Sequence, residues 1–273
     1  MSFLLIYPSP ICADNGYDTE FIDLLEIVYG EGYLSQGGSA LVDRMFEGIE
    51  LEGKTVLDLG CGIGGPALHL AKNHKTCVVG TDPDALMIQK SEAALERLQK
   101  HIHVKGSAHF VLMEDPLTLQ QFPDNSFDIV TSRESILHVP NEHKQHYFKE
   151  IFRVLKTGGQ LVLLDWQHHS PNYSEEVKNM MEMDGVPFYL MTPEEYHQTI
   201  VQSGFSHITR TDLTDAFFKQ TQDDLSIIST EQDRIIEEFG KETLDYSLNS
   251  WRIQGQAFER KELLVAFIKA KKE

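Results

Sequence analysis

The stretch Val56-Leu57-Asp58-Leu59-Gly60-Cys61-Gly62-Ile63-Gly64-Gly65 decides the fold of this 273-residue chain. It joins an apolar, strand-like run, Lys54–Leu59, to the helical pattern of residues 66–74. A glycine-rich turn at such a junction lets the backbone approach a ligand closely, because glycine has no Cβ to collide with it. Nicotinamide-dinucleotide-binding domains use a similar turn, so the turn alone indicates a ligand-binding α/β sheet and leaves the ligand open.

The rest of the chain alternates strand-like and helical segments. Seven strand candidates lie at residues 54–59, 76–81, 108–113, 127–132, 159–165, 206–212 and 263–269. Helical patterns lie at residues 17–29, 39–49, 84–99 and 142–155. Thr192 followed by Pro193 and Glu195 predicts a further helix, with threonine as its cap. Strands that alternate with helices predict a parallel, doubly wound sheet.

The acidic residue before the glycines narrows the choice of ligand. Asp58, Gly60, Gly62 and Gly64 form the pattern D-x-G-x-G-x-G, which resembles the first motif of class I S-adenosylmethionine-dependent methyltransferases. The resemblance implies an α/β, Rossmann-like, doubly wound sheet of seven strands, mostly parallel with the last strand antiparallel. It also implies a methyltransferase activity (EC 2.1.1.-) and S-adenosyl-L-methionine as the cofactor.

Residues at the ends of later strands also fit S-adenosyl-L-methionine, the methyl donor of these enzymes. Asp82 ends the second strand candidate, about twenty residues after the glycines, where a carboxylate can accept both ribose hydroxyls. Asp115, after the third strand candidate, matches the acidic residue that meets the adenine amino group in this superfamily. The resemblance implies further contacts with the methyl donor at Leu34, Ser35, Pro83, Pro116, Ser132 and Arg133.

A closer resemblance extends from about Tyr17 to the last strand. The segments Gly30–Gly38 and Ser132–His138 look like those of small phosphoethanolamine N-methyltransferases. In that family the N-terminal segment is a helical lid, and the tyrosine that matches Tyr17 meets the histidine that matches His138. A related motif occurs in methyltransferases of the thiol-histidine pathway, so it does not fix the substrate.

The chemistry of methyl transfer explains the proposed catalytic residues, Glu134, His138 and Tyr17. An amine nucleophile must present a lone pair, and a carboxylate beside an imidazole can position the amine and take its proton. Glu134 and His138 are four residues apart, so on a helical turn they would share a face. Tyr17 is expected in an N-terminal helix that closes over the acceptor.

Departures from the family concern the acceptor. Glu134 stands where the family has aspartate, and Trp166 where it has tyrosine. The phosphate-binding arginine and tyrosine of the family fall on Val186 and Phe188, and its C-terminal phosphate-binding lysine falls on Gln254. A dianionic phosphate without cations would be held poorly. We therefore expect an acceptor without phosphate, with Trp166, Val186 and Phe188 as candidate substrate contacts.

Composition excludes several classes of partner. The formal net charge of −18 argues against nucleic-acid binding. No apolar run reaches the ~18 residues that span a bilayer, and no Lys or Arg precedes Arg44, which argues against a signal peptide. Three cysteines without a CxxC pair predict neither a disulfide framework nor a zinc site, and fit the cytoplasm. Cys61 and Cys77 are expected to be packing residues.

We expect no metal, because His101, His103 and His109 lack acidic or cysteine partners at metal-like spacing. The small-molecule acceptor remains unidentified, and the sequence does not decide between a monomer and a homodimer. One domain is expected, with a lid at 1–50, a donor-binding core at 51–166, helical acceptor-side additions with the sixth strand at 167–262, and the last strand at 263–273.

The leading hypothesis is a methyltransferase for a small-molecule amine. The alternatives are methylation of carbon, oxygen or a ring nitrogen in a natural product or lipid-like acceptor, a catalytically silent donor-binding module, and a protein or RNA methyltransferase. The complete donor motif together with Glu134 and His138 argues against the silent module, and the acidic charge argues against RNA.

Overall fold

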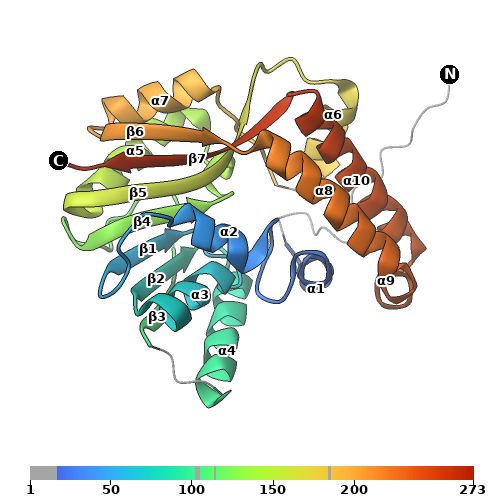
Figure 1. The fold of residues 1–273 in the computed structure, drawn as a ribbon, viewed down its shortest axis with the longest axis horizontal. Coiled ribbons are helices and arrows are strands. Elements are labelled where there is room, and N and C mark those ends of the chain that lie inside the picture. Colours follow the sequence, from blue (N-terminus) through green and yellow to red (C-terminus); the bar gives the residue numbers. More distant parts are fainter. Residues whose placement is uncertain (1–16, 102–104, 114, 184–185) are drawn as a thin grey trace.

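A seven-stranded sheet in the order β3-β2-β1-β4-β5-β7-β6 organises the computed structural model, which describes residues 17–101, 105–113, 115–183 and 186–273. The five strands from β3 to β5 run parallel to one another, and β7 runs antiparallel to both β5 and β6. Figure 1 shows the strands one above another, from β6 at the top to β3 at the bottom, and a separate group of helices beyond one end of the strands. This confirms the expected fold, including the antiparallel last strand.

The described elements follow the expected alternation. The strands are β1 Thr55–Leu59, β2 Cys77–Asp82, β3 Ser107–Leu112, β4 Phe127–Arg133, β5 Leu155–His168, β6 Ser206–Asp212 and β7 Leu263–Lys271. The helices are α1 Thr19–Tyr29, α2 Gly38–Met45, α3 Gly65–His74, α4 Ala85–His101, the 3₁₀ turn η1 Ile136–His138, α5 Asn141–Val154, α6 Glu175–Met183, α7 Pro193–Gln202, α8 Thr214–Thr230, α9 Gln232–Phe239 and α10 Lys241–Glu259.

Alternate residues of the central strands enter two hydrophobic cores. Val56 of β1 packs with α2 and α3 on one face, whereas its neighbour Leu57 packs with α5 and α7 on the other. Both faces of the parallel strands are therefore covered, as βαβ connections require. The side-chain period of two also assigns Asp58 to the face of Val56.

A third core lies beyond the end of the sheet. Phe21 and Leu24 of α1 pack with Ile228 of α8, Ile235 of α9 and Trp251 of α10. In Figure 1 these helices form a group at the right-hand side, away from β3 and β2. Helices from the two ends of the chain thus share one hydrophobic cluster, and that cluster forms the wall opposite the carboxyl ends of the strands.

The boundaries differ from the expected ones for local reasons. Helix α1 begins at Thr19 rather than at residue 17, because the Asp18 side chain accepts a hydrogen bond from the Phe21 amide, 2.8 Å away, and caps it. Tyr17 therefore precedes the helix. Helix α2 ends at Met45, before Gly48 at φ 78°. Strand β5 is longer than expected, with a register shift opposite Phe127.

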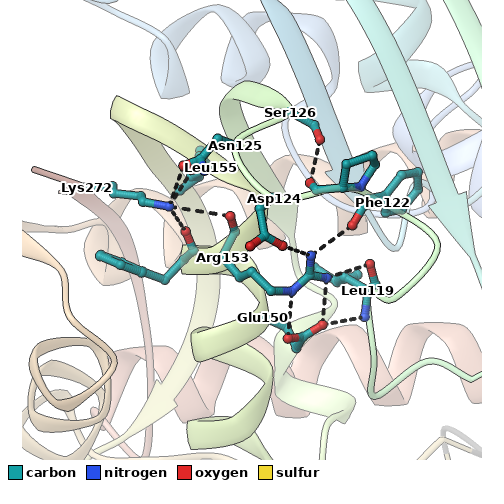
Figure 2. Close-up of polar contacts among 11 residues, drawn as sticks. Leu119, Phe122, Asp124, Asn125, Ser126, Glu150, Arg153, Leu155 and Lys272 are labelled. Carbon is teal, nitrogen blue, oxygen red and sulfur yellow. Dashed lines mark hydrogen bonds and ion pairs between the residues drawn. The ribbon is translucent and has the colours of Figure 1, made fainter.

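Two basic side chains, Arg153 and Lys272, make polar contacts at the end of the sheet where the parallel strands begin (Figure 2). Arg153 of α5 pairs with Glu150 and Asp124 and donates to the carbonyl oxygens of Leu119 and Phe122. Lys272 donates to the carbonyl oxygens of Phe152 and Leu155, which satisfies the C-terminal end of α5. The connection before β4 and the last residues of the chain are thereby fixed to α5.

Several smaller expectations have mixed outcomes. Thr192 and Glu195 form the expected capping box at the start of α7. Cys61 is buried as expected, but Cys77 is exposed at the start of β2 and is not a packing residue. Cys12, the Met1–Ile6 segment, His103 and the side chain of His101 lie outside the described part of the structure. No described helix is both long and apolar enough to cross a bilayer.

Candidate active site

The carboxyl ends of β1, β2 and β4 open into a cavity of about 420 Å³, which the N-terminal and C-terminal helices enclose from the other side. Most of the residues predicted from the sequence line it. They are Tyr17, Leu34, Ser35, Asp58, Gly60, Gly62, Asp82, Pro83, Arg133, Glu134, His138, Trp166, Val186 and Phe188. Parallel sheets place ligands at this edge, so the position agrees with the general rule for such folds.

The glycine turn has little space for side chains. Gly60 lies at φ 69°, and a Cβ there would lie 2.0 Å from the Ser135 Oγ. A Cβ on Gly65 would lie 2.0 Å from the backbone oxygen of Gly32. The turn is therefore in close contact with residues 30–37, which we call the cover segment. Gly64 lies behind the turn against Phe110 and does not line the cavity.

Two buried carboxylates flank the glycine turn. Asp82 accepts hydrogen bonds from the amides of Gly62 and Asp84, each at 3.0 Å. The Oδ2 atom of Asp58 is buried and has no hydrogen-bond partner among the described residues. Burial raises the pKa of Asp58 to about 7 and that of Asp82 to about 6. The turn is thus bordered by negative charge that the protein only partly compensates.

The guanidinium of Arg133 holds the cover segment over the cavity. It donates to the backbone oxygens of Ser35 at 3.0 Å, Gly38 at 3.3 Å and Gln36, and lies over the Tyr33 ring. Its charge also lowers the pKa values of Asp58 and Glu134, opposing the effect of burial. Arg133 therefore positions Leu34 and Ser35.

Glu134 points into the cavity from an unusual backbone conformation. Its φ of 52° is left-handed, which is uncommon outside glycine and often occurs at functional sites. The Glu134 Oε2 accepts a hydrogen bond of 3.1 Å from the Trp166 indole. Burial raises the pKa of Glu134 to about 7. Tryptophan in place of the family's tyrosine thus still provides a donor, here to the longer carboxylate.

His138 faces the same cavity, with one ring nitrogen fixed. Its Nδ1 lies 2.8 Å from the backbone oxygen of Pro187. A carbonyl only accepts, so Nδ1 carries the hydrogen and Nε2 of the neutral ring keeps its lone pair. Burial lowers the pKa of His138, which favours this neutral form. The prediction that Glu134 and His138 share one face of a helical turn is wrong, because the 3₁₀ turn begins at Ile136 and Glu134 precedes it.

Residues 186–191, which we call the strap, cross the cavity beside His138. The Tyr189 amide donates to the Leu137 oxygen at 2.7 Å, and the His168 amide donates to the Met191 oxygen at 3.1 Å. The buried Lys144 ammonium donates to the Tyr189 oxygen. Burial lowers the pKa of Lys144 to about 8. The strap therefore holds both Pro187 and Phe188 against the imidazole.

Sequence reasoning missed the polar groups behind the strap. Lys144 reads as one of many charged residues of an amphipathic helix, and Asp165 as a strand residue. In the structure both are buried, and Asp165 accepts a hydrogen bond of 2.8 Å from Tyr196. Burial raises the pKa of Asp165 to about 6. Only the folded structure brings Lys144 of α5 close to Asp165 of β5, where its charge partly opposes the effect of burial on the Asp165 pKa.

Aromatic side chains form the wall of the cavity away from the glycine turn. The Trp166 ring lies 5.9 Å from Phe188 and 5.3 Å from Phe258, centroid to centroid. Trp251 of α10 lies 5.9 Å from Tyr29, and its buried Nε1 has no hydrogen-bond partner among the described residues. This wall is apolar, with one unused N–H donor.

The structure separates four predicted donor contacts from the cavity. Asp115 and Pro116 are exposed and do not line it, and Asp115 accepts a hydrogen bond from the Leu117 amide instead. Ser132 is buried in β4 and does not line it, like Gly64. Tyr17 does line it, together with His138, and stacks on Phe21 with the ring centroids 5.5 Å apart.

The three positions that align with the phosphate-binding residues of phosphoethanolamine N-methyltransferases all line the cavity. Val186 and Phe188 belong to the strap, and the buried Gln254 belongs to α10. Among the described lining residues, Arg133 is the one lysine or arginine, against carboxylates that include Asp58 and Glu134. The cavity therefore has an excess of acidic groups.

Comparisons with known proteins agree with this geometry. Residues 57–163 match the family model described as "Methyltransferase domain". Phosphoethanolamine N-methyltransferase 1 of Zea mays is 33% identical over 232 residues, which cover 85% of this chain and 44% of that protein. The enzyme of the same name from Plasmodium falciparum is 28% identical over 204 residues, covering 74% of this chain and 73% of the relative. The chain spans less than half the length of the plant relatives.

Solved structures have the same fold. Phosphoethanolamine N-methyltransferase 2 of Haemonchus contortus, in complex with phosphomonomethylethanolamine and S-adenosylhomocysteine, superposes with a TM-score of 0.83. It is 24% identical, and the match covers 93% of this chain and 58% of that one. The cyclopropane synthase MmaA2 of Mycobacterium tuberculosis superposes at 0.77 with 15% identity, over 93% of this chain and 94% of that one. At these identities the likeness establishes the fold alone.

The raised pKa of Asp58 predicts how stability depends on pH. Between about pH 4 and pH 7 the folded protein holds a proton on Asp58 that the unfolded chain has released, so the free energy of unfolding falls as pH rises. Asp58→Asn removes this titration. The decrease of the free energy of unfolding with pH should then be shallower by ~1 kcal/mol per pH unit between pH 5 and pH 7. Denaturant unfolding at several pH values measures it.

Asp128→Asn is the matched control for this measurement. Bonds from Thr55 and Lys156 lower the pKa of Asp128 to about 2 against the effect of burial, so this carboxylate stays ionised throughout the window. Its loss should change the free energy of unfolding and leave the slope as in the wild type. An unchanged slope in Asp58→Asn would contradict the assignment of a raised pKa to Asp58.

Proposed function

Since the chain belongs to the class I S-adenosylmethionine-dependent methyltransferases and is distantly related to phosphoethanolamine N-methyltransferases, we propose that it methylates a small-molecule amine without a phosphate group. The observation that carries the proposal is the charge of the cavity. The Asp58 Oδ2 and the Glu134 Oε1 are buried without a hydrogen-bond partner among the described residues, whereas the one arginine of the lining donates to backbone oxygens. Such a cavity suits a cationic amine and leaves little to bind a phosphate.

The donor side suits S-adenosylmethionine. An unpaired buried carboxylate such as Asp58 favours a cationic ligand, and this donor carries an ammonium and a sulfonium. Asp82 keeps further lone pairs for ribose hydroxyls beside the two amides that it already accepts. When bound, the donor supplies an electrophilic methyl group. Leu34, Ser35 and Pro83 border this side, and contacts by Asp115, Pro116 and Ser132 stay predictions.

The acceptor side supports an acid–base role for Glu134 and His138. An alkylammonium with a pKa of about 10 is only ~0.1% neutral at pH 7, so it must lose a proton before it can attack. In the proposed step the Glu134 carboxylate orients the amine and Nε2 of His138 takes its proton. The new N–C bond forms as the S–C bond of the donor breaks, which leaves the neutral thioether.

Three substitutions underlie the expected selectivity against phosphate. Val186, Phe188 and Gln254 line the cavity where the related family holds phosphate, and none of them carries a charge. The aromatic wall of Trp166 and Phe188 instead offers apolar surface and ring faces, which attract cations. The same wall would also suit a carbon, oxygen or ring-nitrogen acceptor in a natural product or lipid-like molecule, which is the second candidate function.

The donor assignment predicts a loss of affinity in Asp82→Ala. Removing a charge-assisted partner of two hydroxyls should weaken binding of S-adenosylhomocysteine by about 1–3 kcal/mol. Isothermal titration calorimetry measures the change, with Asp128→Asn as a control that lies outside the cavity lining and should keep the wild-type affinity. Equal affinities for Asp82→Ala and the wild type would remove the basis for the donor site.

The acid–base assignment predicts that His138→Ala lowers turnover by ~10²–10⁴-fold while donor affinity changes little. Tyr17→Phe should lower turnover less, because its proposed role is to help close the cavity. Steady-state rates on the best amine measure both, and His146→Ala, an exposed residue of α5, is the control. If both variants kept near wild-type turnover, the amine mechanism would be wrong and the second candidate would lead.

The acceptor class is tested with methyl-labelled S-adenosylmethionine and paired amines that differ by a phosphate group, such as ethanolamine and phosphoethanolamine. We expect the phosphate-free member of the preferred pair to be methylated faster. The double variant Val186→Arg/Gln254→Lys should shift the preference towards the phosphorylated member, whereas Val186→Leu/Gln254→Met should not. Faster wild-type turnover of phosphoethanolamine than of any other amine would overturn the proposed acceptor.

A further inference from the structure

A group of three metal-ligand side chains lies on the surface, outside the cavity. Asp43 belongs to α2, and His69 and His74 belong to α3. The Asp43 Oδ1 lies 2.7 Å from the His69 Nε2 and 3.1 Å from the His74 Nε2. Among the described residues, this is the group of at least three histidine, cysteine or acidic side chains whose ligand atoms all lie within 4.8 Å of one another.

The three atoms have the composition of a transition-metal site. A set of two imidazole nitrogens and one carboxylate oxygen binds Zn²⁺ in preference to Mg²⁺ or Ca²⁺. Three protein ligands leave the fourth position of a tetrahedral site for water. Ligand atoms ~2.1 Å from a tetrahedral ion lie about 3.4 Å apart. The side chains would therefore move outward by a few tenths of an ångström to admit the ion.

A neighbouring amide can complete the arrangement. The Asn73 Nδ2 lies 3.0 Å from the His69 Nδ1, the ring nitrogen that points away from Asp43. Metal binding at Nε2 leaves the hydrogen on Nδ1, and a rotated amide would then accept it with its oxygen. Such partners fix the tautomer and the ring orientation of histidine ligands.

We propose that Asp43, His69 and His74 bind one zinc-class divalent cation, with Asn73 as the outer partner of His69. The ion would join α2 to the C-terminal end of α3, helices that lie side by side (Figure 1). Helix α2 follows the cover segment, and α3 follows the glycine turn. The cation would thus tie together the two segments that border the donor side. The proposal does not depend on methyl transfer.

The test uses the full chain without a histidine tag, and Co²⁺ as a spectroscopic probe at pH 7.5. We expect one Co²⁺ per chain with visible absorption of a tetrahedral or five-coordinate site, which Zn²⁺ displaces. His69→Ala and His74→Ala should each abolish this absorption. Asn73→Ala keeps all three ligands and should weaken Zn²⁺ binding by about 10–100-fold. Zn²⁺ should raise the Tm of the wild type and leave that of His74→Ala unchanged.

The control is His146→Ala, which removes an exposed histidine of α5 beside His143 and should retain the full signal. Circular dichroism establishes that each variant is folded before metal is added. The same absorption in His69→Ala as in the wild type, or weak Co²⁺ binding with the spectrum of the hydrated ion, would overturn the proposal. The three residues would then form hydrogen-bonded aspartate–histidine pairs only.

Discussion

The position of one buried guanidinium determines how this active site is assembled. Arg133 stands at the end of β4, 8% exposed, and donates to backbone oxygens of the cover segment. Burying this charge is tolerable because those oxygens and the nearby Asp58 and Glu134 carboxylates compensate it. The cover segment therefore rests against the glycine turn, with Gly32 in contact with Gly65. The cavity is closed on this side because a residue of the sheet holds an N-terminal segment over the glycine turn.

The same interaction sets the chemistry of the acceptor side. The Arg133 Nη1 and Nη2 atoms donate to the protein backbone, and Arg133 is the one lysine or arginine among the described lining residues, so little positive charge is left to meet an anion. Glu134 and His138 remain; burial raises the pKa of Glu134 and lowers that of His138, so it favours the neutral form of each side chain. The strap fixes the histidine tautomer through Pro187, and Trp166 fixes the carboxylate. In the proposed mechanism, charge compensation by Arg133 and proton transfer by His138 are thus separate roles.

The sequence was sufficient where local pattern determines structure. The glycine turn, the strand–helix alternation and the Thr192 capping box are short-range features, and the fold follows from them. Asp58 and Asp82 line the cavity because strand ends converge at one edge. By contrast, the left-handed φ of Glu134, the burial of Lys144 and the grouping of Asp43 with His69 depend on contacts between distant segments. Periodicity cannot encode such contacts.

The central claim is that the cavity binds an amine between Glu134 and His138 and binds no phosphate. A crystal structure of the ternary complex with S-adenosylhomocysteine and the best amine acceptor tests it most directly. The account predicts the acceptor nitrogen within hydrogen-bond distance of the Glu134 carboxylate and the His138 Nε2, with Arg133 still bound to the cover segment. An anionic group of the acceptor bound to Arg133, or an acceptor nitrogen turned away from both residues, would contradict it.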